Sequence, residues 1–255
     1  MPPWIHVNGK VALVTGGSRG IGESIAKALG QSGAQVAIAS RKLSGVNAAA
    51  DRLRAASVDA APFACHAGKP DQVEALIHAV VARFGKIDVV VNNAATNPHF
   101  GPMMTAEDAA FDKVFEVNTK GYFHVARAVA RHLIERGAPG SIINVASMLG
   151  LTAAPLQGLY GMTKAAVVSM TRTLAVELAP SGIRVNAIAP GLVDTRFAAA
   201  IVENPDLVEM ERRRTPQHRY AQPDEIAGAA LYLASDAASF VTGHTLVIDG
   251  GRTIG

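Results

Sequence analysis

Residues 10 to 22 read Lys10-Val-Ala-Leu-Val-Thr-Gly-Gly-Ser-Arg-Gly-Ile-Gly22. The first six form a short apolar run rich in β-branched residues, which is typical of a buried parallel strand. Apolar residues at helical spacing follow the glycines: Ile21, Ile25, Ala28 and Leu29. A strand, a glycine turn and a helix in this order present free backbone N–H groups and a positive helix end to a phosphate. We therefore predict a dinucleotide-phosphate loop between Gly16 and Gly22.

The three glycines of this loop have separate expected roles. Gly16, Gly20 and Gly22 permit a tight turn, close approach of a pyrophosphate and packing of the helix on the strand. Their spacing is Gly-x-x-x-Gly-x-Gly rather than the common Gly-x-Gly-x-x-Gly. No Lys-Ser/Thr pair follows, which excludes a P-loop. An S-adenosylmethionine methyltransferase shares this opening, but it normally has an acidic residue near Ser40.

The rest of the chain repeats the alternation of strands and helices. Further strands are predicted at 35–40, 60–64, 88–91, 141–145, 184–188 and 245–248. Helices are predicted at 44–56, 70–84 and 223–234, in a long region after Thr105, and around Tyr160. This pattern predicts an α/β fold: one Rossmann-type domain over residues 1–255, with a doubly wound parallel sheet of seven strands and helices on both faces. The irregular stretch at about 195–222 predicts a lid of short helices over the substrate.

Composition narrows the function classes. Of 255 residues, 49% are hydrophobic and 18% charged, and the net charge is only +3. The densest basic run, Glu211 to Arg214, begins with an acid and fits a solvated helix face, so a nucleic-acid partner is not expected. A single cysteine, Cys65, fits a reducing compartment. The sequence has no metal-ligand pattern and no uninterrupted apolar span. We expect no signal peptide, and we expect a soluble cytoplasmic protein without a membrane partner.

A tyrosine and a lysine stand four residues apart on the helix predicted around residue 160. At this spacing Tyr160 and Lys164 share one helix face. A phenol ionises near pH ~10, and a nearby ammonium favours the phenolate. The pair is therefore a candidate general acid/base, and Ser147 lies just beyond the strand at 141–145.

The residues after the second strand predict the cofactor. This strand ends in Ser40-Arg41-Lys42, where a site that selects NAD would have an acidic residue. A hydroxyl and two cations suit a 2′-phosphate, to which Arg19 would add a charge, so we predict NADP(H) in preference to NAD(H). His66 follows the third strand, where an adenine could lie, and the small residues after Asn93 leave room for a flat ring. Asn118 lies among apolar residues as either a structural cross-link or the anchor of a water.

Taken together, these motifs resemble the classical short-chain dehydrogenase/reductase family over nearly the whole chain, with features similar to its NADPH-dependent carbonyl reductases and 3-oxoacyl-[acyl-carrier-protein] reductases. The resemblance rests on Thr15 to Gly22, Asn92 to Ala95, Asn118, Ser147, Tyr160 with Lys164, and Pro190 to Thr195. Two positions depart from the family pattern: Ala95 replaces a glycine, and His66 replaces an acid near the adenine.

The resemblance implies a role for each catalytic residue. Tyr160 donates the proton, Lys164 binds the nicotinamide ribose and lowers the pKa of the tyrosine, Ser147 bonds the substrate oxygen, and Asn118 holds a relay water. Thr195 and the backbone of Val193 hold the carboxamide. The implied cofactor-binding set is Gly16, Ser18, Arg19, Gly20, Ile21, Gly22, Ser40, Arg41, His66, Asn93, Ala94, Ala95, Tyr160, Lys164, Pro190, Gly191, Val193 and Thr195.

The expected reaction is hydride transfer between NADP(H) and a carbonyl or secondary alcohol, with an apolar ketone as substrate. The expected pocket lining is Asn97, Pro98, Met103, Met104, Met148, Leu149, Leu192 and Phe197. A 3-oxoacyl thioester on acyl carrier protein is an alternative, for which Arg127, Arg131 and Arg136 would have to lie near the pocket mouth; we favour a solvated helix face for them. A cofactor-sensing protein without chemistry would have lost Ser147, Tyr160 or Lys164. The resemblance further implies a homotetramer, or a dimer, and small residues at Ala165, Ala166 and Ser169 would allow close helix packing.

Overall fold

The computed structural model describes residues 5–255 and contains one parallel sheet of seven strands. The strand order is β3-β2-β1-β4-β5-β6-β7. The chain crosses from one half of the sheet to the other between β3 and β4, which places a topological switch point between β1 and β4. Each predicted strand is present: β1 (Val11–Thr15), β2 (Gln35–Ser40), β3 (Ala60–Ala64), β4 (Val89–Asn92), β5 (Gly140–Val145), β6 (Ile183–Pro190) and β7 (Thr245–Ile248).

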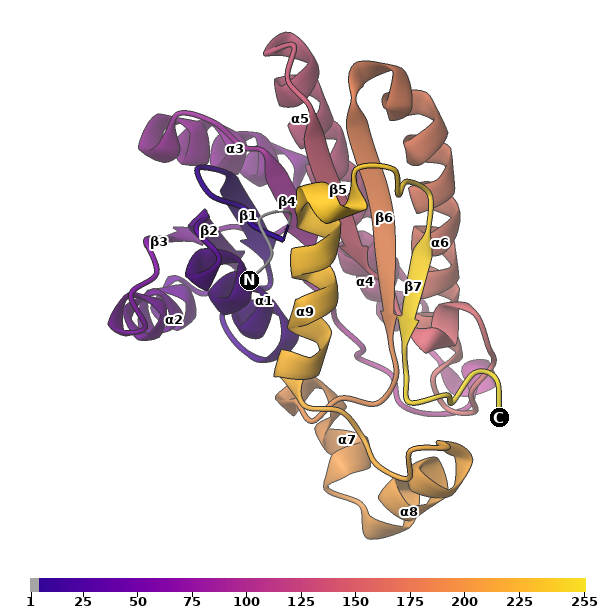
Figure 1. The fold of residues 1–255 in the computed structure, drawn as a ribbon. Helices are drawn as coiled ribbons and strands as arrows, with labels where there is room; N and C mark the ends of the chain where they lie inside the picture. The colour runs from indigo at the N-terminus through magenta and orange to yellow at the C-terminus, as the bar shows by residue number, and fades with distance from the viewer. Residues whose placement is uncertain (1–4) are drawn as a thin grey trace.

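Helices cover both faces of the sheet, as Figure 1 shows. Helices α1 (Gly20–Gln31), α2 (Leu43–Ala55) and α9 (Pro223–Ala234) pack with one buried cluster. Helices α3 (Pro70–Phe84), α5 (Gly121–Glu135) and part of α6 (Gly158–Leu178) pack with the other. Side chains alternate between the two clusters along β1, where Ala12 and Val14 face one and Val11 and Leu13 the other, as a strand buried on both faces requires.

The long helical region predicted after Thr105 is divided into three parts. Helix α4 (Asp108–Phe115) passes through a π-helical turn (η2, Glu116–Lys120) into α5. Asn118 is buried in that turn. Single π-helical turns widen the backbone locally and occur often at functional sites, and apolar periodicity in the sequence does not reveal them.

Short helices occupy the stretch between Thr195 and Gln222, as predicted. They are a 3₁₀ turn (η5, Arg196–Ala198), α7 (Ala199–Val202) and α8 (Pro205–Arg214). Figure 1 shows α7 and α8 beyond the end of the sheet to which β6 and β7 point. Two contacts join this stretch to the C-terminal segment: the Gln217 N–H donates to the Gly250 carbonyl (3.2 Å), and Arg252 Nε lies 3.2 Å from Glu211 Oε2.

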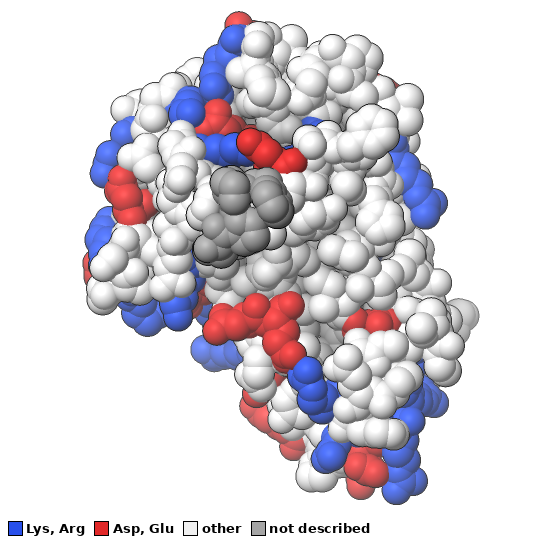
Figure 2. All heavy atoms as spheres, in the orientation of Figure 1, with Lys and Arg blue, Asp and Glu red and all other residues white. Residues whose placement is uncertain are grey.

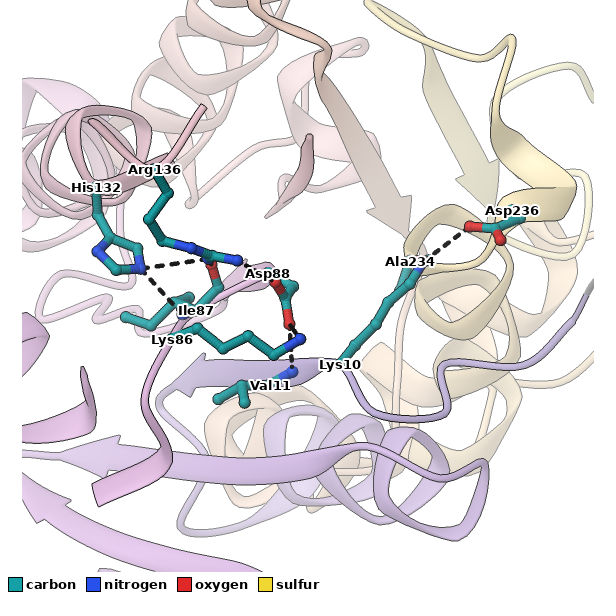
Figure 3. A network of polar contacts seen from close by, with 9 residues as sticks. All are labelled: Lys10, Val11, Lys86, Ile87, Asp88, His132, Arg136, Ala234 and Asp236. Atoms are coloured by element: carbon teal, nitrogen blue, oxygen red, sulfur yellow. Dashed lines mark hydrogen bonds and ion pairs between the residues drawn. The ribbon is translucent and has the colours of Figure 1, made fainter. Parts of the chain in front are cut away.

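A polar network ties the elements together at the opposite, amino-terminal edge of the sheet (Figure 3). The Asp88 carboxylate accepts from the Val11 N–H (2.9 Å) and from Arg136 (3.1 Å), and it pairs with Lys86 (2.9 Å). Burial works to raise the pKa of Asp88, but these three partners outweigh it and hold the pKa below its usual value. Arg136 is therefore remote from the carboxyl edge of the sheet, which removes it as a contact for a carrier protein at the pocket mouth.

His132 belongs to the same network and makes it sensitive to acid. Its Nε2 accepts the Ile87 N–H at 3.1 Å, which requires a neutral ring. Burial first, and then Arg136, lower the pKa of His132 below its usual value. Below pH ~6.5, the pKa of histidine in the unfolded chain, the unfolded chain binds more protons than the folded chain. The stability that the neutral His132 ring contributes is therefore complete above that pH. It is lost as the pH falls through the lower folded-state pKa of His132.

We predict that wild-type protein loses thermal stability more steeply than His132→Gln as the pH falls from about 7 to about 5. Glutamine can accept the same N–H through an uncharged oxygen. The measurement is the midpoint of thermal unfolding of both proteins across this range, with His78→Gln, at an exposed position of α3, as a surface control. Parallel curves for wild type and His132→Gln would contradict the prediction.

Charges of both signs are interspersed on the face of the molecule that Figure 2 shows. On the face in Figure 2, Lys and Arg side chains lie beside Asp and Glu, also over the lower end where α7 and α8 lie, and no broad area of that face carries a single sign. Among residues 5–255, no helix is long and apolar enough to cross a membrane.

Candidate active site

A cavity of about 940 Å³ lies at the carboxyl edge of the sheet and brings most of the predicted site residues together. In an open α/β sheet, ligands bind at this edge, next to the switch point. Gly22 and Asn118 lie outside its lining. The predicted residues that do line it are Gly16, Ser18, Arg19, Gly20, Ile21, Ser40, Arg41, His66, Asn93, Ala94, Ala95, Ser147, Tyr160, Lys164, Pro190, Gly191, Val193 and Thr195.

The glycine loop makes the expected tight turn. Gly16 has a φ of +66°, and a Cβ there would lie 2.8 Å from both Asn93 Nδ2 and Ala94 Cα. Gly22 packs against the loop on the side away from the cavity, and a Cβ at this position would collide with Asn93 Nδ2 and the Gly16 carbonyl. Helix α1 begins at Gly20 with no side-chain cap. Its first N–H groups therefore face the cavity as an anion-binding helix end.

Asparagine side chains fasten the strands around this loop. Asn93 Nδ2 donates to the carbonyls of Thr15 (3.1 Å) and Gly16 (3.2 Å). Asn92 Nδ2 donates to Asn144 Oδ1 at 3.0 Å, which joins β4 to β5. These bonds hold the loop that carries Ala94 and Ala95 rigidly against the glycine turn.

Cations gather where β2 ends. Arg19, Arg41 and Lys42 all line the cavity, and within residues 5–255 none of them forms an ion pair with a carboxylate. His66 closes this end; its Nδ1 accepts the Gly68 N–H at 3.1 Å. Burial, followed by the charge of Lys113, lowers the pKa of His66. This end of the cavity is electropositive without any charge on the histidine.

Ser147, Tyr160 and Lys164 meet at the other end. All three are buried, and the Tyr160 ring lies 5.5 Å from that of Phe197, centroid to centroid. Lys164 Nζ donates to the Val145 carbonyl (2.7 Å) and to Tyr122 Oη (3.1 Å). Ser147 Oγ accepts the Leu149 N–H at 3.1 Å, which leaves the serine proton free to be donated.

The electrostatics differ from what the pairing of Tyr160 with Lys164 suggested. Burial raises the pKa of Tyr160 above its ordinary value, and a hydrogen bond with Ser147 only partly opposes this. Burial lowers the pKa of Lys164 to about 7. The net direction for Tyr160 is therefore opposite to the expected one, because Lys164 bonds Val145 and Tyr122 and the loss of water around both groups dominates.

The side chain of Asn118 acts as a cross-link. Its Nδ2 donates to the Thr96 carbonyl (2.9 Å) and to Thr163 Oγ1 (3.2 Å), and its Oδ1 accepts the Thr96 N–H (2.8 Å). Both amide protons are committed, so Asn118 joins the loop after β4 to helix α6. Of the two interpretations open from the sequence, the structure supports the cross-link.

The wall around Tyr160 is mostly apolar. Three of the residues predicted to line the cavity do not line it: Pro98, Met103 and Met104. The side chain of Met104 is instead 95% exposed. The predicted members present are Asn97, Met148, Leu149, Leu192 and Phe197. Phe100, Gln157, Ile201, Glu211 and Arg252 line the cavity but were not predicted from the sequence, since their approach depends on how the loops fold back.

The geometry defines a dinucleotide-binding α/β protein, and comparison with known proteins identifies the family. A family model described as enoyl-(acyl carrier protein) reductase matches residues 16–253. A relative from Arabidopsis thaliana, short-chain dehydrogenase/reductase SDRA, is 38% identical and covers 96% of this chain and 95% of its own. Dehydrogenase/reductase SDR family member 4 from Bos taurus is 37% identical over 96% of this chain and 88% of its own. The chain belongs to the short-chain dehydrogenase/reductase family.

Comparison with solved structures supports this family assignment. A gluconate 5-dehydrogenase from Burkholderia cenocepacia J2315, in complex with NADP and tartrate, superposes with a TM-score of 0.95 at 37% identity and covers 99% of this chain and 98% of its own. A 3-ketoacyl-(acyl-carrier-protein) reductase from Brucella melitensis, complexed with NADH, gives a TM-score of 0.91 at 35% identity over 97% of this chain and 100% of its own. The protein is thus an oxidoreductase of a fold that binds a nicotinamide dinucleotide.

Proposed function

We propose that this protein is an NADP(H)-dependent oxidoreductase that interconverts a carbonyl group and a secondary alcohol. The observation that carries the proposal is a single cavity with two ends. Tyr160, Ser147 and Lys164 meet at one end, and the cations Arg19 and Arg41 lie at the other. Hydride transfer requires the substrate and the dinucleotide to lie in one cavity. The first end would bind the carbonyl substrate, and the second would bind the phosphate of the dinucleotide.

Tyr160 is the proposed proton donor. Its raised pKa keeps the proton on the hydroxyl at neutral pH, as an acid for carbonyl reduction requires. Ser147 Oγ accepts the Leu149 N–H, so the hydroxyl proton of Ser147 remains available for donation. Two hydroxyl donors aimed at one carbonyl oxygen would stabilise the negative charge that develops there.

Lys164 is the proposed link between Tyr160 and the cofactor. An ammonium has three N–H donors, and two of them are committed to the Val145 carbonyl and Tyr122 Oη. The third is left for a ribose hydroxyl. A relay water at Asn118 would have to donate to an oxygen of this residue, because both amide protons of its side chain are committed.

The residues of the cavity fit a nicotinamide dinucleotide phosphate. The uncapped start of α1 and the glycine loop would hold the pyrophosphate, and Ser40, Arg19 and Arg41 would hold the 2′-phosphate. His66 would meet the adenine, and Pro190 to Thr195 the carboxamide. When bound, NADPH supplies the hydride.

We predict that Arg41→Ala raises the KM for NADPH about tenfold and changes the KM for NADH less than about twofold, because a guanidinium-phosphate contact exists only with the 2′-phosphate. The measurement is steady-state kinetics with both cofactors. Lys27→Ala, which removes an exposed cation of α1 outside the cavity, is the matched control. Equal changes for NADPH and NADH would refute the assignment of Arg41.

The substrate we propose is an apolar ketone, on the ground that Met148, Leu149, Phe100 and Ile201 line the wall near Tyr160. The short helices between Thr195 and Gln222 would form its lid. Phe197 in that stretch already packs against Tyr160, and the Glu211–Arg252 pair ties it to the C-terminal segment. A 3-oxoacyl thioester is the alternative favoured by the similarity to the Brucella melitensis reductase.

The test is oxidation of NADPH and NADH at 340 nm with purified protein and a panel of apolar ketones, dicarbonyls, polyhydroxy keto acids and 3-oxoacyl thioesters. The proposal predicts turnover that is faster with NADPH and greatest with apolar ketones. Tight NADPH binding with no turnover of any compound would instead favour a cofactor sensor.

We further propose that the chain forms a homotetramer, or a dimer, in the cytoplasm. Ala165 and Ser169 of α6 are exposed, as are Phe111 of α4 and Phe123 of α5, so these helix faces are available for pairing. Cys65 is a free, buried thiol, in keeping with a reducing compartment. Light scattering coupled to gel filtration measures the oligomeric state.

A further inference from the structure

A second tyrosine lies behind the lysine of the proposed catalytic set. Tyr122 is the second residue of α5 and is 1% exposed. It does not line the cavity. A tyrosine buried this deeply needs a partner for its hydroxyl, and the partners it has are both connected to the site.

Three polar atoms form a closed triangle at this point. Tyr122 Oη donates to the Val145 carbonyl at 2.9 Å. Lys164 Nζ donates to the same carbonyl at 2.7 Å and to Tyr122 Oη at 3.1 Å. Val145 ends β5, two residues before Ser147, so the triangle joins α5, β5 and α6 directly beneath the proposed catalytic residues.

The hydrogen-bond roles in the triangle are determined. A phenol has one proton, and that of Tyr122 is committed to the Val145 carbonyl. Its oxygen can therefore only offer a lone pair to Lys164, which favours a full complement of protons on Nζ. With two N–H groups held on this side, the third is directed away from the triangle, to the side on which Lys164 lines the cavity.

The aromatic rings reinforce this placement. Lys164 Nζ lies 4.7 Å from the centroid of the Tyr122 ring and 5.5 Å from that of Tyr160. Both distances fall in the range in which a cation is attracted to a ring face. Among the described residues, the titratable groups that meet the ammonium are these two tyrosines; β5 contributes an uncharged carbonyl, and burial is the sole cause of the lowered pKa of Lys164.

Local backbone features bring Tyr122 to this position. The π-helical turn η2 ends at Lys120, and Gly121 opens α5 with its Cα close to the loop after β3, where a Cβ would lie 3.2 Å from Ala67. The widened turn and the close approach let α5 start against the sheet. The Tyr122 carbonyl is additionally held by Asn92 Nδ2 at 3.4 Å.

We propose that Tyr122 is a positioning residue for Lys164: its hydroxyl, oriented by the Val145 carbonyl, holds the ammonium so that one N–H faces the cavity. This inference rests on the proposed role of Lys164. Tyr122 takes no part in proton transfer itself, since its proton is committed to a main-chain carbonyl with no route onward.

The test is Tyr122→Phe, which keeps the ring and removes only the hydroxyl. We expect kcat to fall about tenfold, as for loss of a hydrogen bond to a charged group, with the KM for the carbonyl substrate within about twofold of wild type. The alkaline limb of the pH profile of kcat should move to lower pH by about half a unit or more, because the ammonium loses an acceptor. Tyr232→Phe, on α9 outside the cavity, is the matched control and should change none of these.

A double-mutant cycle shows whether Tyr122 acts through Lys164. The dissociation constant for NADPH, measured by fluorescence, is compared for wild type, Tyr122→Phe, Lys164→Ala and the double variant. We expect Tyr122→Phe to weaken binding in the wild-type background and to have no effect once Lys164 is absent. Equal effects in both backgrounds, or a Tyr122→Phe variant with lower thermal stability but unchanged kcat and pH profile, would overturn the inference. Such a result alongside an inactive Tyr160→Phe would leave the proposed function standing.

Discussion

Replacing Tyr160 with Phe is expected to lower kcat for carbonyl reduction by about a thousandfold, within the range of a lost general acid together with a hydrogen bond to the developing charge. The substitution removes one oxygen. The ring stays in place against Phe197, which lies 5.5 Å away, so the cavity keeps its shape. The measurement is single-turnover oxidation of NADPH at 340 nm with saturating substrate.

NADPH binding provides the control for this experiment. Tyr160→Phe should bind the cofactor within a fewfold of wild type, because the phosphate-binding residues are untouched. Ser147→Ala should give a smaller loss of about a hundredfold, since Tyr160 would remain to donate. Full turnover by Tyr160→Phe would remove Tyr160 from the catalytic set.

Lys164→Met is expected to change rate and stability in opposite directions. The kcat of the variant should fall about a hundredfold, because no positive charge then lies beside Tyr160 and the bound cofactor. It should also unfold at a higher temperature than wild type at neutral pH. Burial lowers the pKa of Lys164 to about 7, which means that burying the ammonium opposes folding, and Met fills a similar volume without a charge.

The pH dependence of this stability difference follows from the direction of the shift. Lys164 has a lower pKa in the folded chain than its unfolded value of about 10.4, so the penalty is full below the folded-state pKa. Between the two values the unfolded chain binds more protons, and the wild type gains stability as the pH rises. Thermal unfolding of both proteins from about pH 6 to about pH 9 should show the advantage of Lys164→Met shrinking. A constant or growing advantage would contradict the stated protonation of Lys164.

Much of the fold could be predicted because its determinants are local. The apolar run before Gly16, the repeated alternation of strands and helices, and Pro70 and Pro223 at helix starts are all visible in the sequence. The strands at 35–40, 60–64 and 245–248 begin and end where they were predicted. Most of the predicted site residues line one cavity for a related reason: in a parallel sheet the residues just past each strand converge on one edge.

What the sequence did not reveal depends on tertiary contacts. The π-helical turn at Asn118 has no signature in apolar periodicity, and the hydrogen bonds that commit Asn118 come from Thr96 and Thr163. Met103 and Met104 were misassigned because a loop can turn an apolar residue outward as easily as inward. The pKa of Tyr160 was predicted from one neighbour along its helix, whereas burial by the whole fold determines its direction.

The measurement that tests the central claim most directly uses NADPH deuterated on the nicotinamide carbon that donates the hydride. The protein is mixed with this cofactor and the best ketone of the panel, and the product alcohol is analysed by mass spectrometry and NMR. Direct reduction predicts one deuterium on the carbinol carbon of the wild-type product, and at least a hundredfold slower formation with Tyr160→Phe. Alcohol formed without deuterium at that carbon, or formed equally fast by Tyr160→Phe, would contradict the account.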